Sequence, residues 1–299
     1  MPRALVPLVF VVAACGSVQI LRSPTERLID SIGEDPAAWE ASREGALSDP
    51  STREAVVRGA FDRVLELDRA ARAAEKANDV DARDRARLEQ SRYEEELSRD
   101  GEAAARHAVE RAGGAGPEVR VALALLGRLD EALVVAAARD ALTADTASRR
   151  RGALRVLEQK PSRVEAALDD AIARTADESW IVRREAATAL AQDRSVRSGT
   201  ALARLLADRD LLVAREAALG LGRRHAREWF EPLISFLERA SASHDPLATD
   251  AAITALKEAT GRDFPPDPKV WRRWVEESRP LPGAAASAPQ TAPAPEPSR

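Results

Sequence analysis

A small residue followed four positions later by leucine recurs five times in the second half of the chain. The pairs are Ala122 and Leu126, Ala153 and Leu157, Ala186 and Leu190, Ala217 and Leu221, and Ala252 and Leu256. Successive alanines lie 31, 33, 31 and 35 residues apart, a period that accommodates two helices. Because one helical pair cannot bury its own apolar face, this repetition predicts a stack of such pairs, with alanine where helices approach closely.

The same pattern predicts which face of each helix is buried. At about 100° per residue, Val182, Ala189, Leu190 and Asp193 project within about 60° of Ala186, which is the width of a core stripe. No stretch alternates apolar and polar residues over the length of a strand. We therefore predict an all-α chain that forms an α-α superhelix, or solenoid, of helical pairs.

Two segments give the repeat in its clearest form, DESWIVRREAATALA from Asp177 and DRDLLVAREAALGLG from Asp208. They resemble the short bacterial HEAT and HEAT-like repeats over roughly residues 114–278, and the resemblance implies an α-solenoid with an extended surface. The chain also departs from that family, because Ala214 replaces an expected arginine and Arg149-Arg150-Arg151 replaces the Val-Arg pair. We therefore expect the family's ladder of aspartate and arginine to be interrupted.

The N-terminus has the layout of an export signal. Residues 1–14 combine one cation, Arg3, with an apolar run that is too short to span a bilayer, for which about 20 residues are needed. The segment Val12-Ala13-Ala14-Cys15 resembles the lipobox of bacterial lipoproteins, in which the cysteine is lipidated and becomes the new N-terminus. We expect a signal peptide over 1–14 and a lipidated tether over 15–24, with the protein exported and anchored to a bacterial membrane facing the periplasm or exterior.

A strongly charged helical region precedes the repeats, over residues 25–113. Between Glu66 and Glu102, 20 of 37 residues are charged, and the sparse apolar positions favour a solvated helical hairpin that turns near Asn78-Asp79. A coiled coil that dimerises through residues 60–110 is the alternative, although the irregular apolar spacing opposes it.

Helix starts and the end of the array are marked by proline and tryptophan. Four Asp-Pro steps, at residues 35–36, 49–50, 245–246 and 267–268, place a capping carboxylate before a proline suited to the first helical position. Phe264, Trp271 and Trp274 predict a cap that closes the array at residue 278, with an aromatic ligand cage as the alternative. The Pro- and Ala-rich residues 279–299 predict a disordered tail.

Charge and composition limit the kinds of site and partner that we expect. The net charge is −4, and residues 177–278 hold 16 cations against 17 acidic residues, without the cationic excess of a nucleic-acid-binding surface. The three histidines are far apart, and the single cysteine, Cys15, leaves no thiol for a disulfide or a metal site after lipidation. We expect no catalytic residues, no metal, no cofactor and no nucleic-acid partner.

We therefore expect a non-catalytic, membrane-tethered repeat module that binds another protein in the cell envelope. The candidate binding residues lie opposite the Ala186 stripe and its copy in the next repeat: Ile181, Arg184, Leu212, Arg215 and Leu219. The alternative is that this side packs on the second helix of each pair. Other functions left open are a homo-oligomeric envelope component and, from Trp180 with Arg183-Arg184, a HEAT-like DNA alkylpurine glycosylase.

Overall fold

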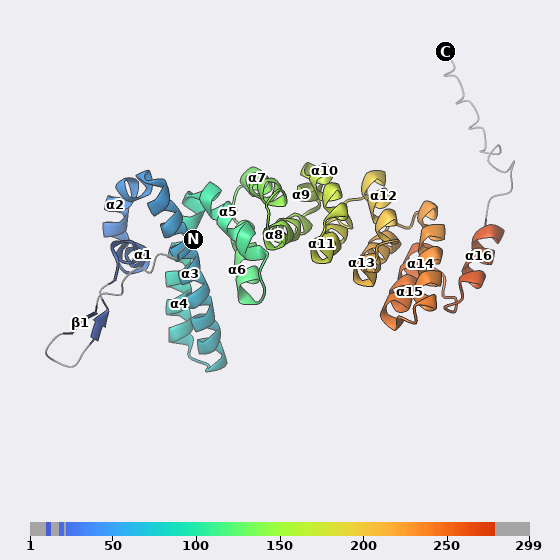
Figure 1. Cartoon of the computed structure of the whole chain (residues 1–299). Helices are drawn as coiled ribbons and strands as arrows, with labels where there is room; N and C mark the ends of the chain where they lie inside the picture. Colours follow the sequence, from blue (N-terminus) through green and yellow to red (C-terminus); the bar gives the residue numbers. More distant parts are fainter. Residues whose placement is uncertain (1–9, 13–17, 21, 279–299) are drawn as a thin grey trace, which may run out of the picture. The chain divides into compact units, whose positions relative to one another are not determined.

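The computed structural model describes residues 10–12, 18–20 and 22–278, and these residues form two compact units that divide between Asp193 and Arg194. Both units are helical (Figure 1). The first contains α1 (Pro24–Glu34), α2 (Pro36–Ser48), α3 (Pro50–Lys76), α4 (Val80–Arg99), α5 (Gly101–Ala112), α6 (Pro117–Leu126), α7 (Glu131–Leu142), α8 (Ala147–Glu158), α9 (Pro161–Ala166), α10 (Leu168–Ala173), η1 (Arg174–Ala176) and α11 (Trp180–Leu190). The second contains α12 (Val196–Leu205), α13 (Leu211–Gly222), η2 (Arg227–Trp229), α14 (Phe230–Ala242), α15 (Pro246–Thr260) and α16 (Pro268–Glu277). The predicted all-α repeat class is confirmed.

One short pair of strands was not predicted from the sequence. Residues Phe10–Val12 (β1) pair antiparallel with Val18–Ile20 (β2), with Val11 opposite Gln19. Both segments are rich in β-branched or aromatic residues, which favour an extended backbone. Each strand has only three residues, which is too short to show an alternation of apolar and polar residues in the sequence. Cys15 and the tail 279–299 lie outside the described residues.

All four Asp-Pro steps begin helices as predicted. Each aspartate is an N-cap, and its carboxylate accepts a hydrogen bond from a backbone N–H in the first turn of α2, α3, α15 or α16. These bonds satisfy N–H groups that have no partner within the helix. The helix starts are therefore fixed by local chemistry.

The charged helices α3 and α4 form the predicted hairpin, which turns at Asn78 with a φ of 57°. Its buried acid, Asp68, accepts hydrogen bonds from Arg72 at 3.1 Å and from Arg87 at 3.4 Å, and Arg120 of α6 binds both of its oxygens. Burial raises the pKa of Asp68, but the hydrogen bonds and charges of Arg120 and Arg72 outweigh it, so the net pKa is lowered. These contacts fasten the hairpin to α6 within the first unit.

The alanine and leucine pairs occupy the core, as predicted. All five alanines and all five leucines of the repeated pattern are completely buried, as are Val182 and Ala189, while Asp193 is half-buried. In the first unit α7 packs with α8 and α10 with α11, and in the second α12 packs with α13 and α14 with α15. These four pairs are the repeating units.

The first predicted repeat is an exception to the stacking. The helix that carries Ala122, α6, packs mainly on α5 and α3, whereas α5 is the helix that lies against α7 and α8. The charged region and the first repeats therefore share one compact unit, and the chain does not divide near residue 114, where the array was predicted to begin. The buried residues of α5 include the small Ala104, Ala105 and Ala108, and the carbonyl oxygen of its Val109 lies 2.2 Å from the place that a Cβ on Gly152 of α8 would take.

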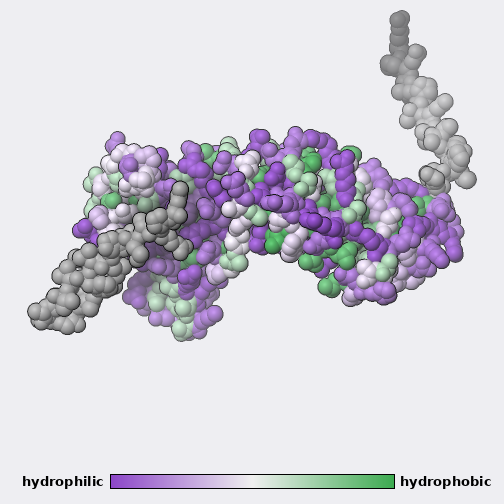
Figure 2. Space-filling view, viewed as in Figure 1, coloured by the Kyte–Doolittle hydropathy of each residue, from purple (hydrophilic) through white to green (hydrophobic). Residues whose placement is uncertain are grey.

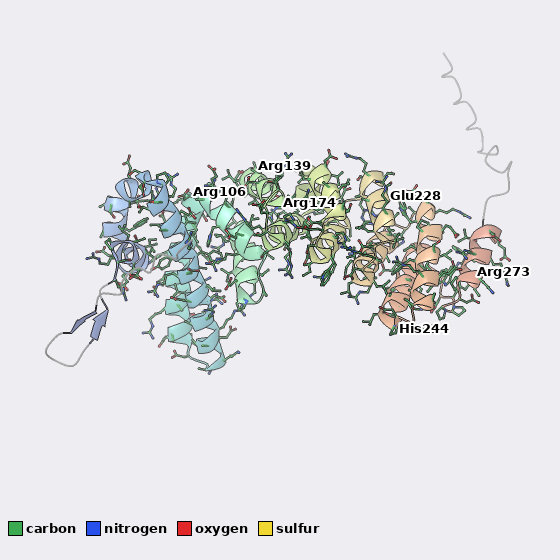
Figure 3. The ribbon with its side chains drawn as sticks, in the orientation of Figure 1. Arg106, Arg139, Arg174, Glu228, His244 and Arg273 are labelled. Atoms are coloured by element: carbon green, nitrogen blue, oxygen red, sulfur yellow. The ribbon has the colours of Figure 1, made fainter. Side chains whose placement is uncertain are left out.

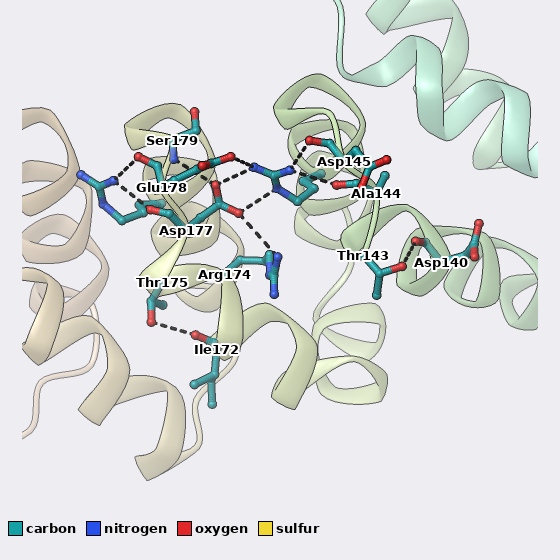
Figure 4. A network of polar contacts seen from close by, with 12 residues as sticks. Asp140, Thr143, Ala144, Asp145, Ile172, Arg174, Thr175, Asp177, Glu178 and Ser179 are labelled. Atoms are coloured by element: carbon teal, nitrogen blue, oxygen red, sulfur yellow. Dashed lines mark hydrogen bonds and ion pairs between the residues drawn. The ribbon is translucent and has the colours of Figure 1, made fainter.

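The aspartate and arginine ladder is also different from the expected one (Figure 4). Arg150, 5% exposed, donates to both carboxylate oxygens of Asp177 at 2.8 and 2.9 Å and to the carbonyl oxygens of Ala144 and Asp145. Arg183, 33 positions later, donates in the same way to the carbonyl oxygens of Asp177 and Glu178. Arg150 therefore makes in α8 the carbonyl contacts that Arg183 makes in α11, and it also pairs with an aspartate. The interruption that we expected at this repeat was wrong.

Aromatic residues close the second unit at α16. Trp271 is completely buried, its indole N–H donates to the carbonyl oxygen of Pro265 at 3.1 Å, and its ring meets Phe264 edge to face at 5.0 Å. Trp274 contacts Phe230 of α14 at a centroid distance of 5.9 Å. The rings thus fill space against one another and α14, which is the packing that the cap interpretation predicts.

Candidate protein-binding surface

Apolar residues occupy the slot five positions before the repeated alanine in three helices. They are Ile181 on α11, Leu212 on α13 and Leu247 on α15. Leu212 is 37% exposed and Leu247 is 62% exposed, whereas Ile181 is half-buried. Each residue lies in the first turn of its helix, which starts in register because the repeat fixes the helix start.

In the first unit, the candidate surface is built on α11. Trp180, the first residue of the helix, is 37% exposed, and the guanidinium of Arg184 lies over its ring at 5.6 Å from the centroid. Arg184 also contacts the carboxylate of Glu185 at 3.2 Å, and the same oxygen accepts hydrogen bonds from Arg151 and Arg155 of α8. Arg184 is thus held between an aromatic face and a buried acid, so its orientation is fixed before any partner binds.

In the second unit, the candidate surface joins two adjacent helices. Leu212 and Leu247 begin α13 and α15, which pack directly on each other. Arg215 leaves 29% of its side chain exposed and contacts Glu216 at 3.7 Å, and Leu219 is half-buried one turn further on. This surface combines two accessible leucines with one loosely held cation.

The five predicted residues are therefore all at least partly accessible, but to different degrees. Leu212 is exposed, and Ile181, Arg184, Arg215 and Leu219 are intermediate, since α11 also packs on α8 and α10, and α13 on α12, α14 and α15. Sequence reasoning missed Leu247, the most exposed apolar residue of the set. The signal was present, because Leu247 follows Leu212 by the same 35 residues that separate Ala252 from Ala217.

The arginine pair on which the DNA-glycosylase alternative depends is split between two environments. Arg183 is buried and donates to two backbone carbonyl oxygens, whereas Arg184 lies at the surface on Trp180. Only Arg184 of the two therefore presents its guanidinium at the surface.

The described part of the chain holds no candidate metal site and no helix that could cross a membrane. Within the described ranges, no three His, Cys, Asp or Glu side chains are grouped so that they could hold a metal ion. Among the described helices, none is both long and apolar enough to cross a membrane. The surface visible in Figure 2 is mostly hydrophilic, with smaller hydrophobic areas between the charged side chains.

Comparison with known proteins supplies no family. No family model matches the chain, and no curated protein matches it. Solved structures that resemble it include an engineered protein, with a TM-score of 0.45 and 17% identity over 81% of this chain and 100% of the other. A designed armadillo repeat protein in complex with the peptide (KR)4 gives a TM-score of 0.44 and 11% identity over 80% of this chain and 100% of the other. Because these TM-scores are low, the helical repeat fold rests on the chain's own periodic packing.

Proposed function

We propose that this protein is a HEAT-like repeat module, anchored by a lipid to a bacterial membrane, that binds another protein of the cell envelope through the first turns of α13 and α15. One observation supports this proposal above all. Leu212 and Leu247 occupy the same position of successive repeats and stay accessible, although the leucine four positions after the repeated alanine is completely buried in every repeat. Exposed apolar side chains at matched positions on adjacent helices, beside an arginine, have the composition of an interface core.

A double substitution tests the proposal. Replacing Leu212 and Leu247 together by aspartate should abolish photo-cross-linking of the native partner to a benzoylphenylalanine placed at Leu219, because two charges would be buried at the contact. Folding should be retained, since both residues lie in the first turn of a helix, where a carboxylate interacts favourably with the helix dipole. Cross-linking in cells of the native host, followed by identification of the adduct, gives the measurement.

The matched control is Val196→Asp, which places the same charge on an exposed valine in the first turn of α12 in the same unit. Val196 is 67% exposed but lies outside the proposed surface, so this variant should cross-link as the wild type does. Equal adduct yields from the double variant and the control would contradict the proposed surface.

The membrane anchor is proposed on the sequence of residues 1–15. Replacing Cys15 by alanine should abolish incorporation of labelled palmitate and shift the protein from the detergent phase to the aqueous phase, because the acyl chains supply the membrane affinity. Ser17→Ala should leave both properties unchanged. Labelling of the Cys15→Ala protein at the wild-type level would refute lipidation at this position.

A homo-oligomeric envelope component is the second candidate function. It is favoured by two exposed apolar side chains on the otherwise charged α4, Val80 at 51% and Leu88 at 61% exposure. Benzoylphenylalanine placed at Leu88 in place of Leu219 distinguishes the two candidates, because an adduct between two copies of this chain from that position would favour self-association.

A further inference from the structure

A pocket of about 360 Å³ lies in the first unit where α3, α5 and α8 meet. Its apolar lining consists of Pro50, Val57 and Ala103, and its charged or polar lining consists of Arg53, Glu54, Arg106, His107, Glu110 and Arg149. Figure 3 shows one of these, Arg106 on α5. The pocket is far in sequence from the proposed protein-binding surface and belongs to the part of the chain where the repeat pattern changes.

Arg149 occupies a position that three of the other four repeats give to small apolar residues, while α6 has Glu118 there. The slot four positions before the repeated alanine holds Val182 in α11, Val213 in α13 and Ala248 in α15, all of them buried. In α8 the slot holds Arg149, whose Nε is buried without a hydrogen-bond partner in the described part of the chain. An arginine here costs stability that valine would not, so packing does not explain its presence.

His107 adds a neutral polar side chain to the same pocket. Its Nε2 accepts a hydrogen bond from Nε of Arg111 at 3.3 Å, and its ring meets Phe61 edge to face at 5.2 Å. Burial and then the charges of Arg111 and Arg58 lower the pKa of His107 to about 4, so the imidazole is neutral near pH 7. With Nε2 accepting, the single proton lies on Nδ1, which is therefore a donor.

The positive and negative side chains that line the pocket do not balance in number. Glu54 is paired with Arg58 at 2.8 Å, so its negative charge is already compensated. Arg106 is paired with Glu102, and Arg53 has only a 3.4 Å contact with Asp100. Of the remaining groups, Arg149 lines the same pocket as Glu110, and its Nε has no hydrogen-bond partner among the described residues. Counted over the lining itself, three arginines against two glutamates leave one positive charge in excess.

From this arrangement we propose that the pocket binds a small monocarboxylate with a short aliphatic body. The carboxylate would accept hydrogen bonds from Arg149 and His107, since a guanidinium forms paired hydrogen bonds with a carboxylate. The aliphatic body would lie on Pro50, Val57 and Ala103. The single excess charge favours a monoanion over a phosphate group.

Titration calorimetry of the full chain with butyrate tests the proposal. We expect saturable binding with one site per chain, no binding of butylamine, and weaker binding of inorganic phosphate. Replacing Arg149 by valine, the residue of α11 and α13 at this position, should weaken butyrate binding by at least about tenfold. Its melting temperature should equal or exceed that of the wild type, because the unpartnered buried donor is removed.

The matched control is Arg139→Val on α7, which removes an arginine of the same unit that pairs with Asp170 outside the pocket (Figure 3). This variant should bind butyrate as the wild type does. Absence of saturable binding to the wild type, or binding by the Arg149→Val protein at wild-type strength, would overturn the proposal. Phosphate binding that exceeds butyrate binding would also overturn it.

Discussion

Replacing Asp177 by alanine should lower the free energy of unfolding by about 3–5 kcal/mol, because it leaves the guanidinium of Arg150 buried without its carboxylate. Both side chains are almost completely buried, and they share two hydrogen bonds of 2.8 and 2.9 Å (Figure 4). Asp177 also accepts from the backbone N–H of Ser179 at 3.0 Å, which links the loop to the start of α11. Urea unfolding of the full chain, followed by circular dichroism, gives the measurement.

The matched control removes an acid of the same unit that is only partly buried. Asp170 pairs with Arg139 at 2.8 Å, with 35% and 56% of the two side chains exposed, so Asp170→Ala should cost less than about 1 kcal/mol. Adding Arg150→Met to the Asp177→Ala variant should recover part of the lost stability, since no unpaired charge then remains buried. A loss as small as that of the control would show that Arg150 does not depend on Asp177.

The same pair gives a pH dependence with a defined sign. Burial raises the pKa of Asp177, but hydrogen bonds from Arg150 and from the Ser179 backbone, with the charge of Arg150, hold the pKa below the ordinary value of 3.8. A depressed carboxylate pKa stabilises the fold above the unfolded-state value, and this contribution is lost as the pH falls through the folded-state value. The difference in stability between wild type and Asp177→Ala should therefore shrink below about pH 3.8.

Replacing Gly152 by alanine should destabilise the first unit by about 3 kcal/mol, at the upper end of the range for overpacking. A Cβ at this position of α8 would lie 2.2 Å from the carbonyl oxygen of Val109 and 2.7 Å from the backbone nitrogen of Gly113. Backbone atoms of a packed helix cannot move aside as the end of a flexible side chain can, so α8 and α5 would have to separate. Urea unfolding of the full chain measures the loss.

Gly45→Ala is the matched control for this substitution. Gly45 lies within α2, and a Cβ there would meet no atom within 4 Å. Alanine should therefore stabilise the chain by about 0.5–1 kcal/mol through its higher helix propensity. Equal free energies of unfolding for the Gly152→Ala and Gly45→Ala variants would contradict the close approach of α5 and α8.

Much of the local structure was determined by the sequence itself. The Asp-Pro steps fix four helix starts because the capping bond and the proline ring act within one turn. The spaced alanines and leucines identify the buried face of five helices because an α-helix repeats its faces every 3.6 residues, whatever lies opposite. The turn at Asn78 follows from the break between two charged helical segments.

Which neighbour covers each buried face was decided only by the tertiary structure. The repeat marks Ala122 like the other alanines, yet α5 and not α6 lies against α8, where Gly113 and Gly152 allow two backbones to approach closely. The run Arg149-Arg150-Arg151 looks uniform in sequence, but its members face a pocket, the carboxylate of Asp177 and the carboxylate of Glu185. The periodicity of the sequence specifies the side of its helix on which a residue lies. The residue that it contacts belongs to a segment 27 or more positions away, and the two segments meet only in the folded chain.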